Sequence, residues 1–121
     1  MRRLRKMTEQ MLLFSTLYSQ SNKENFKMPT YILLSTTTDE GAETIKMKPE
    51  RIKEVNKELE AMGVKVLAQY AVLGPYDFVN IVEGPDTATM LRVSVNMGSR
   101  GSVKILTLPA VPIDEFIAGL K

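Results

Sequence analysis

The chain has 121 residues, of which 44% are hydrophobic and 25% charged, the size and composition of one globular domain. It contains no histidine and no cysteine, which excludes disulfides, thiolate or histidine metal ligands, and Ser-His-Asp or Cys-His catalysis. The formal net charge is only +2 and no basic stripe accompanies it, so the composition argues against nucleic-acid binding.

The first 27 residues differ in character from the rest. They hold six of the 16 basic and two of the 14 acidic residues, so residues 28–121 alone carry a net charge of −2. The apolar patch at residues 11–14 is too short for a secretory signal or a membrane span. We predict that residues 1–27 are a dispensable extension. Whether residues 4–17 form a weak amphipathic helix within it is left open. The alternative is a targeting or partner-binding arm.

The first half of the folded part, residues 28–121, predicts a strand, a helix and a second strand. Residues 31–37 are apolar and β-branched, as in a strand, and residues 38–41 interrupt this pattern. A helix is predicted over residues 49–62, with proline in its first turn and a glycine stop after its end. Its apolar residues recur at spacings of three and four: Ile52, Val55, Leu59 and Met62. Residues 64–73 are predicted as the second strand.

The second half predicts a strand, a helix and a strand again, followed by a short helix. A Gly-Pro turn leads into a third strand at residues 77–83, which forms a hairpin with the second. Asp86 is the expected cap of a helix that runs to about residue 97. A fourth strand spans residues 103–108, and Pro109 and Pro112 separate it from a short helix at 113–120. The order β-α-β-β-α-β predicts an α+β, ferredoxin-like fold: a four-stranded antiparallel sheet with both helices on one face.

Two helices cover only one face of such a sheet, and the pattern leaves the other face mostly apolar. Alternation places one set of second-strand residues on one face: Val64, Val66, Ala68, Tyr70 and Val72. The opposite face carries Lys65, Leu67, Gln69, Ala71 and Leu73. The second helix has two apolar stripes, Ala88, Leu91 and Val95 beside Met90, Val93 and Met97. Because exposed apolar patches mark interfaces, we predict a homodimer or higher homo-oligomer. Alternatively, the N-terminal arm or the C-terminal helix covers this face.

Several motifs in this pattern resemble those of the GYD-domain family. They are Gly74-Pro75-Tyr76-Asp77-Phe78, residues 31–41 ending in Thr-Thr-Asp-Glu-Gly, Pro49-Glu50-Arg51, and Gly84-Pro85-Asp86. The resemblance covers roughly residues 29–116 and departs at Lys48, in place of a small capping residue, and at Pro75. It implies a small prokaryotic protein similar to the dimeric α/β-barrel superfamily, in which two ferredoxin-like subunits pack sheet against sheet and enclose a cavity. It implies no settled biochemical role.

The turn before the third strand holds the first candidate site. The Asp77 carboxylate could accept hydrogen bonds from turn amides while Tyr76 bridges to a neighbouring strand, which is a structural role. The functional alternative makes Tyr76 an acid and Asp77 a base at a cavity mouth. Gly74 is interpreted as a position where a side chain would clash or a ligand approaches closely, and Pro75 as a residue that stiffens the turn.

Other polar residues are weaker candidates. In a face-to-face dimer, some strand side chains would point into the central cavity and orient a ligand: Tyr70, Asn80, Lys65 and Gln69. The alternative for them is a solvated strand surface. Arg100 could hold a carboxylate. The Thr36-Thr37-Thr38-Asp39 run could bind an anion or a hard metal through oxygen, but its composition favours a strand end, and no metal site is predicted.

Two classes of function remain open. We predict a non-catalytic module that binds a small molecule or another protein. The alternative is a cofactor-independent enzyme of the monooxygenase or isomerase type that uses Tyr76 and Asp77. In either case we expect a cytoplasmic protein with no cofactor and with neither a nucleic acid nor a membrane as its partner.

Overall fold

The computed structural model describes residues 28–121, so the predictions for residues 1–27 lie outside the described part of the chain. The described helices and strands follow in the order β1 (Thr30–Thr37), α2 (Asp39–Met47), α3 (Arg51–Ala61), β2 (Lys65–Ala71), β3 (Phe78–Glu83), α4 (Thr87–Gly98), β4 (Val103–Ala110) and α5 (Ile113–Leu120). The four strands form one antiparallel sheet in the order β2-β3-β1-β4. This is the predicted ferredoxin-like arrangement followed by the predicted C-terminal helix α5, and only α2 is an unpredicted addition.

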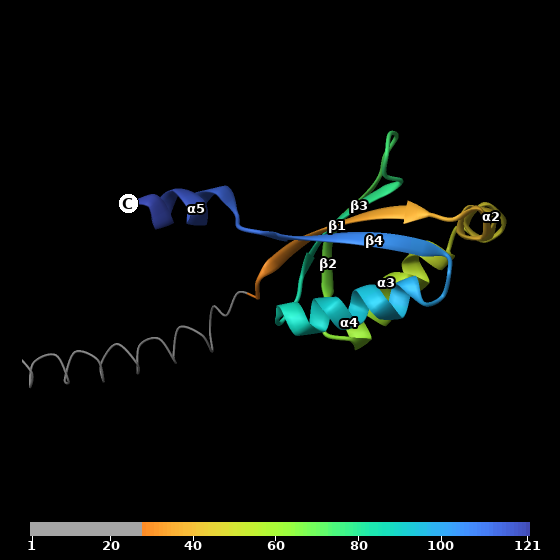
Figure 1. Cartoon of the computed structure of the whole chain (residues 1–121), viewed down its shortest axis with the longest axis horizontal. Coiled ribbons are helices and arrows are strands. Elements are labelled where there is room, and N and C mark those ends of the chain that lie inside the picture. Colours follow the sequence, from red (N-terminus) through yellow and green to blue (C-terminus); the bar gives the residue numbers. More distant parts are fainter. Residues whose placement is uncertain (1–27) are drawn as a thin grey trace, which may run out of the picture.

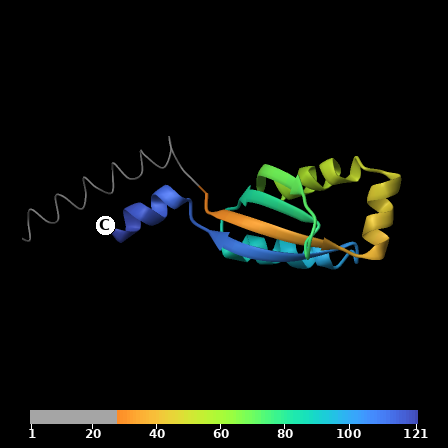
Figure 2. The ribbon, with the colours of Figure 1, turned by 90° about the horizontal axis from the view of Figure 1, so that it is seen from above.

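Helices α3 and α4 lie on the same face of the sheet, and α2 lies across one end of it (Figures 1 and 2). The core fills the space between the sheet and these helices. Its buried residues are Tyr31, Leu33, Leu59, Val64, Val82, Met90, Val93 and Met97. The α4 stripe that contains Met90, Val93 and Met97 therefore faces inward. The other stripe of α4 faces outward, with Leu91 62% exposed and Val95 71% exposed.

Helix α2 is not predicted by the sequence, in which residues 38–41 only interrupt the first strand. The Thr38 hydroxyl accepts a hydrogen bond from the Gly41 amide at 3.1 Å and so caps the helix, while Asp39 and Glu40 lie in its first turn. The residues that end β1 thus begin a helix. Lys48 is the C-cap of α2, and α3 begins only at Arg51. Pro49 accordingly precedes α3 instead of lying in its first turn.

The predicted faces of β2 are wrong beyond Val66 because a β-bulge lies between Val66 and Ala68. The extra residue shifts the alternation by one position. Val66 and Gln69 pair with Val82 and Asn80 on the helix side of the sheet, whereas Ala68 and Tyr70 lie on the open side. Composition alone does not reveal such a bulge, since residues 64–73 alternate equally well in either register.

The C-terminal strand and helix test two further predictions. Pro109 lies within β4 instead of ending it; β4 is an edge strand, where a residue without an N–H is tolerated. Helix α5 spans the predicted residues but extends away from the sheet (Figures 1 and 2). Its apolar side chains are exposed: Ile113, Phe116, Ile117 and Leu120. The alternative in which this helix covers the open face of the sheet is therefore wrong.

Candidate functional site

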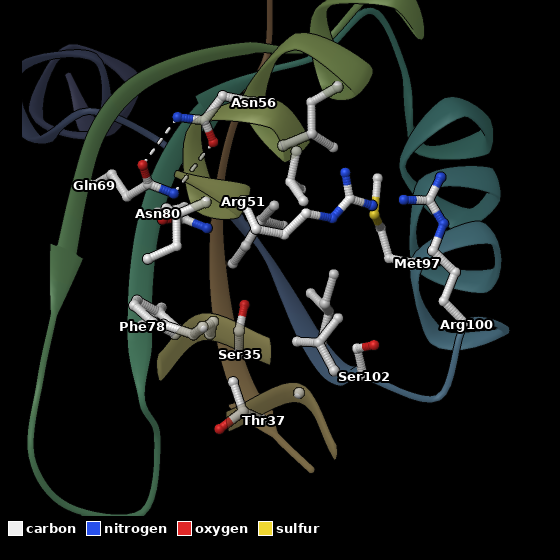
Figure 3. Close-up of a pocket in the computed structure, with 18 of the residues that line it drawn as sticks. Ser35, Thr37, Arg51, Asn56, Gln69, Phe78, Asn80, Met97, Arg100 and Ser102 are labelled. Atoms are coloured by element: carbon white, nitrogen blue, oxygen red, sulfur yellow. Dashed lines mark hydrogen bonds between the residues drawn. The ribbon is translucent and has the colours of Figure 1, made fainter. Parts of the chain in front are cut away.

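A cavity of about 150 Å³ lies between the helix side of the sheet and helices α2, α3 and α4. It is within a single chain, on the side opposite to the one where the sequence analysis placed a cavity between two subunits. Figure 3 shows the side chains that surround it. Apolar atoms make up most of its surface, and the aliphatic lining residues are Leu33, Ile45, Ile52, Val55, Leu59, Val103 and Ile105. A space of this volume accommodates a molecule about the size of benzene.

The sheet supplies the polar floor of the cavity. Ser35 of β1 and Asn80 of β3 are 5% and 8% exposed, and both lie on the helix side. In the strand register Asn80 pairs with Leu33, and Ser35 pairs with Phe78, so the two polar side chains are diagonal neighbours. Within the described chain, Asn80 Oδ1 is buried without a hydrogen-bond partner. The floor therefore carries a carboxamide and a hydroxyl, and the oxygen of the carboxamide is itself buried.

A reciprocal pair of amides closes the cavity on the β2 side. Asn56 Nδ2 of α3 donates to Gln69 Oε1 at 2.9 Å, and Gln69 Nε2 donates to Asn56 Oδ1 at 3.2 Å (Figure 3). The pair joins α3 to β2. The bulge in β2 makes it possible, because it turns Gln69 to the helix side.

Two arginines line the outer part of the cavity and share one carboxylate. Arg51 Nη1 lies 3.2 Å from Glu58 Oε1, and Arg100 contacts the other oxygen, Oε2. Arg51 also contacts Glu54 at 3.2 Å, and Glu54 binds Lys48 at 3.0 Å. The Arg100 hydrogen bond, with help from Arg51, holds the pKa of Glu58 below its ordinary value. The charges at this rim are thus paired with one another.

Close packing between α2 and the loop after α4 forms the end wall. The Thr38 amide donates to the Ser102 carbonyl at 3.0 Å, and the Thr38 hydroxyl donates to the Gly101 carbonyl at 2.8 Å. Gly41 is buried against the same loop. A Cβ at this position would collide with the Ser102 carbonyl oxygen. Glycine is therefore required here for space.

The cavity brings together some of the predicted site residues and leaves others outside. Asn80, Gln69 and Arg100 line it. Tyr70 is 59% exposed on the open side of the sheet, and neither Tyr76 nor Lys65 is part of the lining. The pairing of Tyr76 and Asp77 as acid and base at a cavity mouth therefore finds no support at this cavity.

Asp77 instead joins two strands. Its Oδ2 accepts hydrogen bonds from the Thr37 amide at 2.8 Å and the Thr37 hydroxyl at 2.9 Å. Those two bonds hold the pKa of Asp77 below its ordinary value. The expected donors, the amides of its own turn, are thus replaced by the end of β1. Gly74 has a positive φ of 118°, and a Cβ there would meet nothing within 4 Å, so conformation and not space favours glycine.

Several residues of the cavity were missed in the sequence analysis, among them Ser35, Gly41, Arg51 and Asn56. A signal existed for Ser35, which interrupts the apolar alternation of Tyr31 and Leu33 on β1. Arg51 also lies three and seven residues before its carboxylate partners, on the same helical face as they do. The contact that requires glycine at residue 41 had no signal in the sequence, since it forms with residue 102.

The polar groups inside the cavity are suited to hydrogen bonding. Apart from the two arginines of the outer part, they are neutral amides and hydroxyls, which bind a ligand without exchanging a proton near neutral pH. Among residues 28–121, no group of three or more acidic, histidine or cysteine side chains is placed to hold a metal ion. None of the helices in this range is long and apolar enough to cross a membrane.

Comparisons with known proteins point to one family. The GYD domain family model matches residues 31–120. A curated relative from Thermus thermophilus, named "Glutamine synthetase and cystathionine beta-lyase binding protein", is 63% identical over 95 residues. The alignment covers 78% of this chain and 100% of the relative. No solved structure matches the chain.

Proposed function

The chain belongs to the GYD-domain family, and from that premise we propose that it is a non-catalytic module that binds a metabolic enzyme. The observation that carries this proposal is the 63% identity to a relative that is matched over its whole length and is named for binding two enzymes. Glutamine synthetase and cystathionine β-lyase are accordingly the first partners to test. Such partners would place the protein in the cytoplasm.

The open face of the sheet supports a homodimer within this proposal. In the strand register two apolar rows cross all four strands. One row is Ala68, Ile81, Ile32 and Leu108, and the other is Tyr70, Val79, Leu34 and Leu106. No described helix covers these rows, which we call the open-face patch (Figure 1). The cross-strand pair Lys65–Glu83 borders the patch at one end and Lys104 at the other.

We assign the open-face patch to a second copy of the chain. Two copies packed face to face would bury two such patches in each other, which is the sheet-to-sheet contact that the dimeric α/β-barrel resemblance implies. The loop between β2 and β3 rises on the same side of the sheet (Figure 1) and carries the fully exposed Leu73. A partner copy would cover this side chain as well. We also propose that residues 1–27 are an extension that is not required for folding.

The outward stripe of α4 remains free in such a dimer, because α4 lies on the opposite side of the sheet (Figure 1). Ala88, Leu91 and Val95 form this stripe and are exposed. Apolar side chains at i, i+3 and i+7 on one helix face are a common recognition pattern. We therefore assign the outward stripe of α4 to the enzyme partner.

The test measures binding of the purified chain to glutamine synthetase and to cystathionine β-lyase from the same organism by isothermal titration calorimetry. Wild type is expected to bind at least one of them. Leu91→Asp is expected to weaken binding about tenfold or more, because it places a charge in an apolar contact. The matched control is Leu106→Asp, which makes the same change on the open-face patch instead of the α4 stripe.

The control has its own expected result. Leu106→Asp is expected to disrupt the dimer while each protomer keeps its outward α4 stripe and its affinity per site. Absence of binding to both enzymes would refute the proposed function. Binding that Leu91→Asp leaves unchanged would refute the assignment of the α4 stripe.

A further inference from the structure

The cavity contains a polar group that the fold leaves unsatisfied. Asn80 is 8% exposed, and its Oδ1 has no hydrogen-bond partner among the described residues. Buried polar atoms in native proteins nearly always have a partner, since an unmet one destabilises the folded state. The position pairs with Leu33 in the middle of the sheet, where an aliphatic residue would pack without this cost. Folding alone therefore does not account for an asparagine here.

A second polar group lies beside it. Ser35 is 5% exposed and lines the same cavity. Figure 3 shows Ser35 and Asn80 directed from adjacent strands toward the space beneath α3 and α4. Together the two side chains offer both donors and acceptors over a short distance. They form a polar spot on the floor of the cavity, distinct from Asn56 and Gln69, whose amides are paired with each other.

The remaining lining indicates the charge of a suitable ligand. The cationic residues of the lining, Arg51 and Arg100, are both paired with Glu58 at the rim. An anion would have to displace that carboxylate, and a cation would find no carboxylate among the lining residues. An uncharged ligand meets neither obstacle.

We propose that the cavity binds a small neutral molecule whose apolar body contacts α3 and α4 and whose single hydroxyl or carboxamide group hydrogen-bonds to Asn80 and Ser35. The volume of about 150 Å³ suits one ring or a short branched chain. The site is separate from the enzyme-binding surface, and this proposal does not depend on the proposed function.

The experiment uses the full chain and four probes of similar size. Benzyl alcohol and benzamide carry the required neutral polar group, toluene lacks it, and benzoate is charged. Binding is followed by two-dimensional NMR titration. Benzyl alcohol and benzamide are expected to saturate, with the largest shifts at residues of the cavity, and to bind more tightly than toluene or benzoate.

Three variants test the role of the polar spot. Asn80→Leu and Ser35→Ala are each expected to weaken the binding of benzyl alcohol and benzamide by roughly three- to tenfold, because each variant loses one neutral hydrogen bond. The affinity for toluene is expected to stay unchanged. The matched control is Asn96→Leu, the same change on the exposed side of α4. Urea melts accompany the titrations, and Asn80→Leu is expected to unfold at the same or a higher urea concentration, since it removes the unsatisfied group.

Three outcomes would overturn the proposal. The first is a wild type that saturates with neither neutral probe, which would mean that the cavity holds water only. The second is benzoate binding more tightly than both neutral probes, which would point to an anion site at Arg51 and Arg100. The third is unchanged affinity in both Asn80→Leu and Ser35→Ala. Because Ser35→Ala removes only one oxygen, it keeps the test decisive if Asn80→Leu does not fold.

Discussion

Asp77 joins the start of β3 to the end of β1 through a single carboxylate oxygen. That oxygen accepts from both the amide and the hydroxyl of Thr37, while the Asp77 amide donates to the Ser35 carbonyl at 2.8 Å. Ser35 and Thr37 also line the cavity. The residue thus stabilises the strand ends on which the cavity is built, without lining the cavity itself.

Replacing Asp77 is expected to lower stability. Asp77→Ala leaves two donors of Thr37 without their acceptor, so its urea midpoint should fall below that of wild type. The urea midpoint of Asp77→Asn should fall less, because an amide oxygen still accepts one hydrogen bond. Asp114→Asn, on the exposed helix α5, is the control and should leave the midpoint unchanged. Unchanged midpoints in both Asp77 variants would contradict this structural role.

The same residue predicts a pH dependence. The pKa of Asp77 is lowered below its ordinary value of 3.8 in the folded state, so the unfolded chain binds this proton more readily. Its stabilising contribution is therefore present above pH 3.8 and is lost as the pH falls through the lower folded value. Urea midpoints measured from about pH 5 to about pH 3 should decline less steeply in Asp77→Asn than in wild type.

Asn80, Gln69 and Arg100 show what sequence reasoning can reach at the residue scale. Asn80 and Gln69 are polar residues within apolar strands, which marked them as candidates, and Arg100 was a candidate because it could hold a carboxylate. Their side of the sheet could not be derived, because the β2 bulge changes the direction of Gln69 and pairing with Leu33 decides that of Asn80. The ligand role of these residues stays a proposal.

Helix α2 is held against the loop after α4 by a contact that only glycine permits. Gly41→Val is expected to destabilise the fold by about 1–3 kcal/mol, since its side chain would force α2 away from the Ser102 carbonyl oxygen. Gly98→Ala is the control: an added Cβ meets nothing within 4 Å at the end of α4. That change should stabilise by about 0.5–1 kcal/mol, as alanine does in helices.

Urea melts with linear extrapolation measure both changes. Displacement of α2 should also open the end wall of the cavity, so Gly41→Val is expected to alter the NMR signals of Ser102 and Thr44. A Gly41→Val protein as stable as wild type would show that α2 is not packed as described.

At the scale of elements, most of the pattern was predictable and two features were not. The α4 cap at Asp86, which accepts from the Thr89 amide at 2.7 Å, and the glycine stop after α3 are local signals and are confirmed. Helix α2 escaped prediction because its cap residues also suit a turn. The β2 bulge escaped because its cause is the pairing with β3, which lies outside the strand's own sequence.

The whole molecule is expected to dimerise through the open-face patch. Light scattering at micromolar concentration should report a dimer for wild type and a monomer for Leu106→Asp, because the charge would lie in the centre of the paired sheets. Leu91→Asp, on the outward stripe of α4, should remain a dimer. A monomeric wild type, or a dimer that Leu106→Asp leaves intact, would refute the sheet-to-sheet assembly.

The amino-acid sequence by itself determined the order of the four strands, of α3 and α4 between them and of the C-terminal helix, and with it the antiparallel sheet. These follow from periodicity, capping and turn residues, which act over a few neighbouring positions. Composition also excluded histidine and cysteine chemistry without any structure.

Only the tertiary structure decided where the cavity lies and which side chains meet in it. Ser35, Asn80, Gln69 and Arg51 come from four different elements, and Glu58 brings Arg51 and Arg100 together from distant parts of the chain. Their meeting depends on strand register, on one bulge and on the close approach of α2 to the loop at Ser102. Each of these is a contact between distant segments, and no local pattern encodes it.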